Sequence, residues 1–250
     1  MFRVPTLASL AILTLAACAK PSEAPKPSMA PAAPAASTAS GDLGLGGIEL
    51  AAKSDAPAGA YGIDKAHTSV NFRISHMGFS SYTARFTKID ATLNFDRANP
   101  AAMSVSATIA TNSLQTNYPG TDVNFDAELT GANWLDAAKY PAITFKSTSV
   151  AVTGPNTAKV TGDLTLHGVT KPVTLDVTFN GGYAAMAMDP GGSRIGFSAR
   201  GMIKRSDFGL AAGIPAPGTN MGVSDNIEVI IETEFTRPKD SVPAPAPAAN

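Results

Sequence analysis

Three histidines are the side chains best suited to bind a metal ion: His67, His76 and His167. A zinc site needs at least three such ligands directed at one point. His67 and His76 are nine residues apart, and an odd spacing on one regular strand places two side chains on opposite faces. His167 lies in a predicted turn. We therefore expect no metal site, no bound cofactor, and histidines that are hydrogen-bonded or on the surface.

The sequence also lacks a recognisable set of residues for nucleophilic catalysis. The G-x-S-x-G turn of serine hydrolases is absent, and the single cysteine, Cys18, precedes the predicted domain. Asp163 and His167 are close in sequence, but loop and turn chemistry explains both. Arg205 and Asp207 are interpreted as a structural bridge or cap. The sequence therefore does not predict an enzyme.

The charge distribution argues against a nucleic-acid partner. The chain has 19 Lys and Arg against 20 Asp and Glu, a formal net charge of -1. The charges are interspersed, and there is no basic run of the kind that phosphate backbones require.

The N-terminus has the pattern of an export signal. Arg3 provides a positive charge, 4–17 is an uncharged apolar stretch, and small residues precede Cys18. The residues at 15–18 (LAAC) resemble the bacterial lipobox, which implies cleavage before Cys18 and acylation of its thiol. We expect residues 1–17 to be a signal peptide and Cys18 to anchor the protein on the periplasmic side of a bacterial membrane. Ala19 favours the outer membrane.

Two flanking segments have the composition of disordered chain. Residues 18–59 contain the Ala- and Pro-rich stretch AKPSEAPKPSMAPAAPAASTAS, and 237–250 repeats the theme in PAPAPAAN. Such segments cannot bury enough apolar surface to offset chain entropy. We therefore expect one folded domain at 60–236, between a linker and a tail.

Within that domain, apolar and polar residues alternate in many short runs. The runs include 70–74, 103–109, 173–179, 195–199 and 227–231, and a period of two indicates half-buried strands. About eight strands at hairpin spacing favour an all-β sandwich or barrel.

Interruptions in the alternation predict the connections. The run 82–96 changes phase, which indicates a bulge or sharp bend. Turns are predicted at 97–100, 153–156, 167–169 and 180–182. The one helix candidate is 124–138, with Trp134 and Leu135 folding back on the core.

The apolar members of the alternating runs are the candidate ligand-binding residues. They converge on the inside of either architecture. From the residues alone, the simpler interpretation is that they pack together as a dry core. The set comprises Val70, Phe72, Ile74, Phe86, Ile109, Phe145, Leu164, Leu175, Val177, Phe179, Phe197 and Val229.

Four ordered motifs resemble the YceI-like family and together cover about 60–236. They are 61–72 (YGIDKAHTSVNF), 134–148 (WLDAAKYPAITFKST), 162–173 (GDLTLHGVTKPV) and 205–210 (RSDFGL). The resemblance implies an antiparallel, eight-stranded, lipocalin-like barrel with one short helix. It also implies that the barrel holds a polyisoprenoid-type lipid.

One motif departs from the family pattern. The family carries Arg-Asp-x-His-Leu before its short helix, whereas this chain reads FDAEL at 125–129. Phe125 and Glu128 therefore replace the arginine and the histidine, so a polar contact to a ligand head group is not expected from these two positions.

The sequence thus predicts an exported, lipid-anchored protein that binds or carries a polyisoprenoid-type lipid without catalysis. One alternative is a binding module for another apolar molecule, such as a fatty acid. Another is a structural or interaction protein of the envelope with a filled core. The sequence does not specify the oligomeric state.

Overall fold

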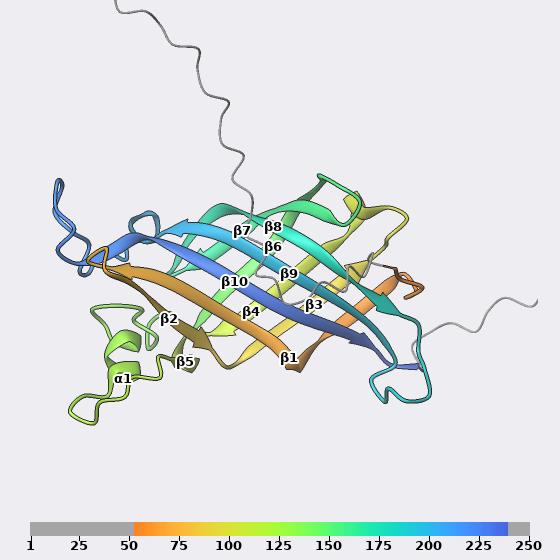
Figure 1. The fold of residues 1–250 in the computed structure, drawn as a ribbon, viewed down its shortest axis with the longest axis horizontal. Helices are drawn as coiled ribbons and strands as arrows, with labels where there is room; N and C mark the ends of the chain where they lie inside the picture. Colours follow the sequence, from red (N-terminus) through yellow and green to blue (C-terminus); the bar gives the residue numbers. More distant parts are fainter. Residues whose placement is uncertain (1–52, 240–250) are drawn as a thin grey trace, which may run out of the picture. The chain divides into compact units, whose positions relative to one another are not determined.

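The computed structural model describes residues 53–239. The predicted signal peptide, Cys18, most of the predicted linker and the end of the tail lie outside this range. The described part is almost entirely β-structure (Figure 1). Its strands are β1 (Gly59–His76), β2 (Ser80–Phe86), β3 (Ile89–Phe95), β4 (Ser104–Ala110), β5 (Leu114–Gln115), β6 (Ala142–Val152), β7 (Thr157–Leu166), β8 (Val169–Tyr183), β9 (Ser193–Lys204) and β10 (Val223–Arg237).

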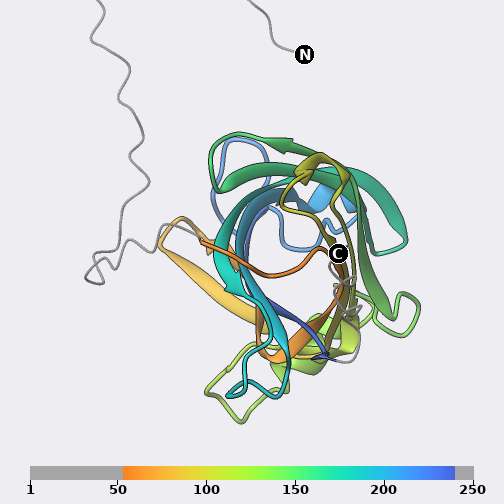
Figure 2. The same ribbon diagram turned by 90° about the vertical axis from the view of Figure 1, so that its right-hand side faces the viewer.

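The strands form one antiparallel sheet that closes on itself, as Figure 2 shows end-on. β10 pairs with β9 on one side and with β1 on the other, so that Val229 lies opposite Gly201 and Phe72. β2 and β3 share one position in the ring, as do β4 and β5, which gives eight positions. This closure confirms the lipocalin-like barrel and excludes the sandwich.

The predicted phase change in 82–96 is the break between β2 and β3. Both strands pair with β1, and Thr87 and Lys88 separate them. The backbone N–H groups of Thr87 and Lys88 are held by Ser113, through its carbonyl and its hydroxyl at 3.0 and 3.1 Å. The inward set therefore moves from even-numbered residues such as Phe86 to odd-numbered ones such as Leu93.

β1 contains a larger irregularity between Asp64 and Ser69. Asp64 pairs with Glu234 and Ser69 pairs with Glu232. Between these two pairs the chain advances five residues along β1 but only two along β10. The extra residues form a bulge in the ladder, and among them the His67 side chain is exposed whereas Thr68 lines the cavity described below. His67 and His76 therefore do not lie on one regular strand, and their odd spacing does not decide which faces they occupy.

The helix is shorter than predicted. α1 covers Phe125–Thr130, with the side chain of Asn124 accepting a hydrogen bond from the Ala127 N–H at 3.0 Å. Gly131 ends it, and residues 132–139 form turns. The extension to 138 was therefore wrong, because the backbone of Gly131 is extended, with φ -76° and ψ 176°, and interrupts the helix. Within 53–239, no helix is long and apolar enough to cross a membrane. The remaining helical segments are short 3-10 turns: η1 (Pro100–Ala102), η2 (Thr111–Ser113) and η3 (Arg205–Phe208).

Three of the four predicted turns are present. The tightest is His167-Gly168 between β7 and β8, where φ is 51° and 75°. Two consecutive positive φ values are typical of a two-residue hairpin, and a Cβ on Gly168 would lie 2.4 Å from the Tyr140 ring. The fourth prediction, 180–182, was wrong. That segment is a bulge inside β8, and the chain turns only after Tyr183.

Two buried clusters lie toward the two ends of the barrel. The first, at the α1 end, includes Phe86, Leu166 and Phe208, with Leu129 and Leu135 packed against it. The second, at the opposite end, comprises Tyr61, Ala91, Leu93, Phe95, Ile195 and Phe235.

The segment 53–58 is held against this second end. The N–H groups of Gly182 and Ala184 donate to the Lys53 carbonyl and the Asp55 carboxylate, at 3.3 and 2.8 Å. Ala56 packs on the second cluster. Ordered contacts therefore extend beyond 60–236 on the N-terminal side, and β10 includes Arg237.

Candidate ligand-binding cavity

A cavity of about 710 Å³ lies inside the barrel. Its wall reaches from Arg97 and Asn156, in the β3–β4 and β6–β7 turns, to Phe125 of α1 at the other end. Val152 lies on the wall and is 58% exposed, so the cavity meets solvent at the β6–β7 turn. The volume falls within the roughly 300–1,000 Å³ typical of small-molecule sites.

All twelve residues proposed from the sequence lie on this wall. All except Val70 and Phe86 are only partly buried, although they point inward. By contrast, Phe208 and Ile195 in the two end clusters are 2% and 0% exposed. The interior is therefore packed in these two clusters and hollow along the rest of its length, so the dry-core interpretation does not describe the whole interior.

The wall also contains residues outside the set proposed from the sequence. Several are further apolar members of the same alternating runs and follow from the same periodicity: Met103, Val105, Ala107, Val173, Ile227 and Ile231. Others lie in turns, where no periodicity predicts a direction. Arg97 and Asn156 are of this second kind.

Aromatic side chains form the wall near α1. Phe125 packs between Tyr82 and Tyr118, with ring centroids 6.0 and 5.4 Å away. Glu128 is exposed and does not reach the cavity. At the two positions where the chain departs from the family motif, it therefore presents an apolar ring to the cavity and a carboxylate to solvent.

Arg205 lies on the same wall but is fully engaged in the fold. It is 4% exposed, and its guanidinium donates to the carbonyls of Ala212, Val223 and Ser224 at 2.8–2.9 Å. Burial lowers its pKa, which the nearby Asp225 carboxylate partly opposes. Arg205 thus has the structural role expected of it, but its partners are carbonyls and not the exposed Asp207.

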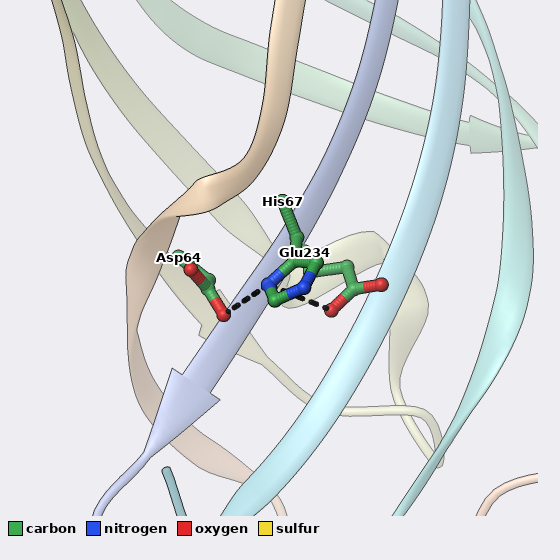
Figure 3. A group of neighbouring side chains, drawn as sticks. All are labelled: Asp64, His67 and Glu234. Carbon is green, nitrogen blue, oxygen red and sulfur yellow. Dashed lines mark hydrogen bonds and ion pairs between the residues drawn. The ribbon is translucent and has the colours of Figure 1, made fainter.

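The three histidines do not gather at one site. His167 lies against Tyr140 and near the Phe208 carbonyl, and His76 is at the end of β1. Within 53–239, one group has the residue types for a metal: Asp64, His67 and Glu234 (Figure 3). His67 Nδ1 lies 2.9 Å from the Asp64 carboxylate and 4.0 Å from that of Glu234.

A guanidinium already occupies the space between these carboxylates. Arg194 Nη1 lies 2.6 Å from Asp64 Oδ2 and 2.5 Å from Glu234 Oε2, and Arg194 Nε lies 2.8 Å from Asp189 Oδ2. Burial alone would raise the pKa of Asp64, but hydrogen bonds from Arg194, His67 and the Ala66 N–H outweigh it and lower the pKa to about 2. The group is therefore an ion-pair network, in which a metal would have to displace Arg194.

The fold and the cavity together define a class: an antiparallel β-barrel that can enclose an apolar molecule. The chain belongs to the YceI family, whose YceI-like domain matches residues 61–235. Protein YceI of Escherichia coli O17:K52:H18 is 43% identical over 188 residues, which cover 74% of this chain and 90% of that protein.

Solved structures share the same architecture. The YceI protein of Campylobacter jejuni is 33% identical with a TM-score of 0.54, covering 70% of this chain and 96% of that one. A polyisoprenoid binding domain from Saccharophagus degradans has a TM-score of 0.51 at 18% identity, covering 71% and 98%. At 18% identity, the similarity to the Saccharophagus domain shows a shared fold alone.

Proposed function

We propose that this protein binds or carries a polyisoprenoid-type lipid in its barrel and performs no catalysis. The observation that carries the proposal is the cavity of about 710 Å³, whose wall consists almost entirely of aliphatic and aromatic side chains. Removing an apolar chain from water is favourable by about 25 cal/mol per Å². The Saccharophagus domain, described as polyisoprenoid binding, supports this class of ligand for the fold.

We further propose that the protein works at the periplasmic side of a bacterial membrane, with the outer membrane favoured. The export pattern, the lipobox-like residues 15–18 and Ala19 support this location. Several acyl chains on Cys18 would give a stable anchor, whereas one chain binds a membrane only marginally.

Two measurements test the proposed ligand. Native mass spectrometry and lipid extraction of protein purified from its host membrane should find a bound prenyl lipid. Added prenol should raise the stability by RT ln(1 + [L]/Kd), about 2.7 kcal/mol at a hundredfold excess over Kd.

Saturated fatty acids of matched length serve as comparison ligands in the same stability measurement. A larger stabilisation by these acids would favour the fatty-acid alternative. Absence of any co-purifying lipid and of any shift with prenols, quinones or prenyl phosphates would favour a structural or interaction role.

A further inference from the structure

Arg97 places a positive charge at the edge of the cavity. It lies in the turn between β3 and β4, is exposed, and forms part of the cavity wall. Its guanidinium carbon lies 5.1 Å from the centroid of the Phe179 ring, which also lines the cavity. The cation therefore rests on an aromatic wall residue at the opening where Val152 meets solvent.

Among residues 53–239, no carboxylate forms an ion pair with this guanidinium. The adjacent Asp96 uses its Oδ1 to accept hydrogen bonds from the N–H groups of Ala98 and Asn99, at 3.0 and 3.2 Å. Among residues 53–239, Arg97 has neither a hydrogen bond nor an ion pair, and no Asp or Glu lines the cavity. The guanidinium donors thus face an opening without a protein acceptor.

The rest of the wall makes this end different from the other. The second arginine on the wall, Arg205, gives its donors to three backbone carbonyls. Near α1 the wall carries Tyr82, Phe125 and Trp134, together with His76 at the end of β1. Polar side chains accompany Arg97 instead, because Ser104 and Asn156 lie on the wall at the same end. Both ends of the cavity therefore carry aromatic side chains, but only the end with Arg97 has a guanidinium whose donors have no protein acceptor among residues 53–239.

We propose that Arg97 binds the anionic head group of the ligand, with the apolar tail extending toward α1. The ligand class is then a prenyl phosphate, because a guanidinium forms paired, charge-assisted hydrogen bonds with phosphate oxygens. A prenyl alcohol offers no such partner. This inference rests on the proposed function, and it assigns the head group to the end opposite the Phe125 and Glu128 positions.

The single tryptophan allows the test to be made on the full chain. Trp134 lies on the cavity wall, so its fluorescence reports filling of the cavity. Geranylgeranyl phosphate, geranylgeraniol and inorganic phosphate are titrated into the native protein, Arg97→Gln and Arg97→Lys. The control is Arg200→Gln, since Arg200 is an exposed arginine on β9 that pairs with Glu228 and does not line the cavity.

We expect Arg97→Gln to weaken binding of the prenyl phosphate about tenfold, as for the loss of one charge-assisted hydrogen bond. Binding of the alcohol should stay unchanged. Arg97→Lys should restore part of the affinity for the phosphate, and Arg200→Gln should match the native protein. The preference for phosphate over alcohol should fall as salt is raised.

The possible failures are distinguishable. Equal affinity of native protein for phosphate and alcohol would overturn the head-group assignment and leave the proposed function standing. Equal weakening of both ligands by Arg97→Gln would also overturn it, because Arg97 would then act through packing on Phe179. Arg97-dependent binding of inorganic phosphate alone would assign the site to free phosphate. Failure of every prenyl compound to bind would overturn the proposed function itself.

Discussion

Arg194 connects three strands at the seam of the barrel. It lies on β9 and contacts Asp64 of β1 and Glu234 of β10, while Asp189 holds it from the preceding loop. The bulge in β1 carries Asp64 and His67 to this position. No sequence pattern predicts this network, because its members are far apart in the chain and have no common spacing.

The first prediction concerns acid stability. The pKa of Asp64 falls from 3.8 to about 2 in the folded protein, so its ionised form stabilises the fold above pH 4. That stabilisation should disappear as the pH falls from about 4 to about 2. Asp64→Asn should lower the free energy of unfolding by about 2 kcal/mol at pH 7. It should also make that free energy depend less on pH between about 4 and about 2.

Urea denaturation at several pH values measures this effect. The control is Asp90→Asn, because Asp90 pairs with Lys65 at 2.8 Å but both side chains are largely exposed. If the unfolding free energy of the native protein and of Asp64→Asn changes equally between pH 4 and pH 2, ionised Asp64 does not stabilise the fold.

The second prediction concerns the cavity wall. Val177→Thr keeps the shape of an inward side chain on β8 but adds a hydroxyl to an apolar surface. We expect binding of prenol to weaken about tenfold. The loss in free energy of unfolding should be smaller than the loss in free energy of binding. Thr178→Val, the reverse change on the outward face of the same strand, should leave binding unchanged. If the two variants bind prenol alike, Val177 does not contact the ligand.

At the scale of elements, strand alternation was the most reliable signal. It predicted the runs that became β1, β4, β8, β9 and β10, because one face of each strand points inward. It did not predict the bulges at 64–69 and 179–181, which depend on pairing with a neighbouring strand. The helix boundary was misjudged for a similar reason, since packing and Gly131 decide where α1 ends.

The third prediction concerns the segment 53–58. Its carbonyls accept hydrogen bonds from buried partners: Tyr61 Oη donates to Pro57 at 2.7 Å, and Arg237 Nη1 donates to Ala58 at 2.5 Å. A chain limited to 60–236 removes these acceptors and also Arg237. We expect it to lose about 2–4 kcal/mol of unfolding free energy relative to 53–239.

Denaturant melts of the two fragments and of the full chain give the comparison. Asp55→Ala in the full chain is a milder version, because it removes only the bond to the Ala184 N–H. Equal stability of 60–236 and 53–239 would show that the segment contributes nothing to the fold.

At the scale of the whole molecule, the family resemblance supplied what the residues could not. Alternation predicts which side chains point inward, but the space between them depends on how many strands close the ring and how they tilt. A filled barrel and a hollow one therefore have the same pattern. Neither the ring closure between β1 and β10 nor the charge of Arg97 at the cavity edge follows from any local signal.

The fourth prediction concerns the anchor. Cys18 lies outside the described residues, and its acylation remains a prediction from residues 15–18. Cys18→Ser should yield either uncleaved precursor or mature protein that no longer sediments with membranes. Mass spectrometry of the mature N-terminus and membrane fractionation distinguish these results. Mature Cys18→Ser protein that still partitions fully with membranes would contradict the lipoprotein proposal.

Ring closure also determines the order in which the barrel can be assembled. The seam joins the first and last strands, with Ile63 opposite Phe235. Pairings so distant in the chain form slowly, because a long loop must close first. The barrel cannot be completed until β10 has been synthesised. Every earlier stage leaves two unpaired strand edges and an apolar inner face in water, the conditions that favour aggregation.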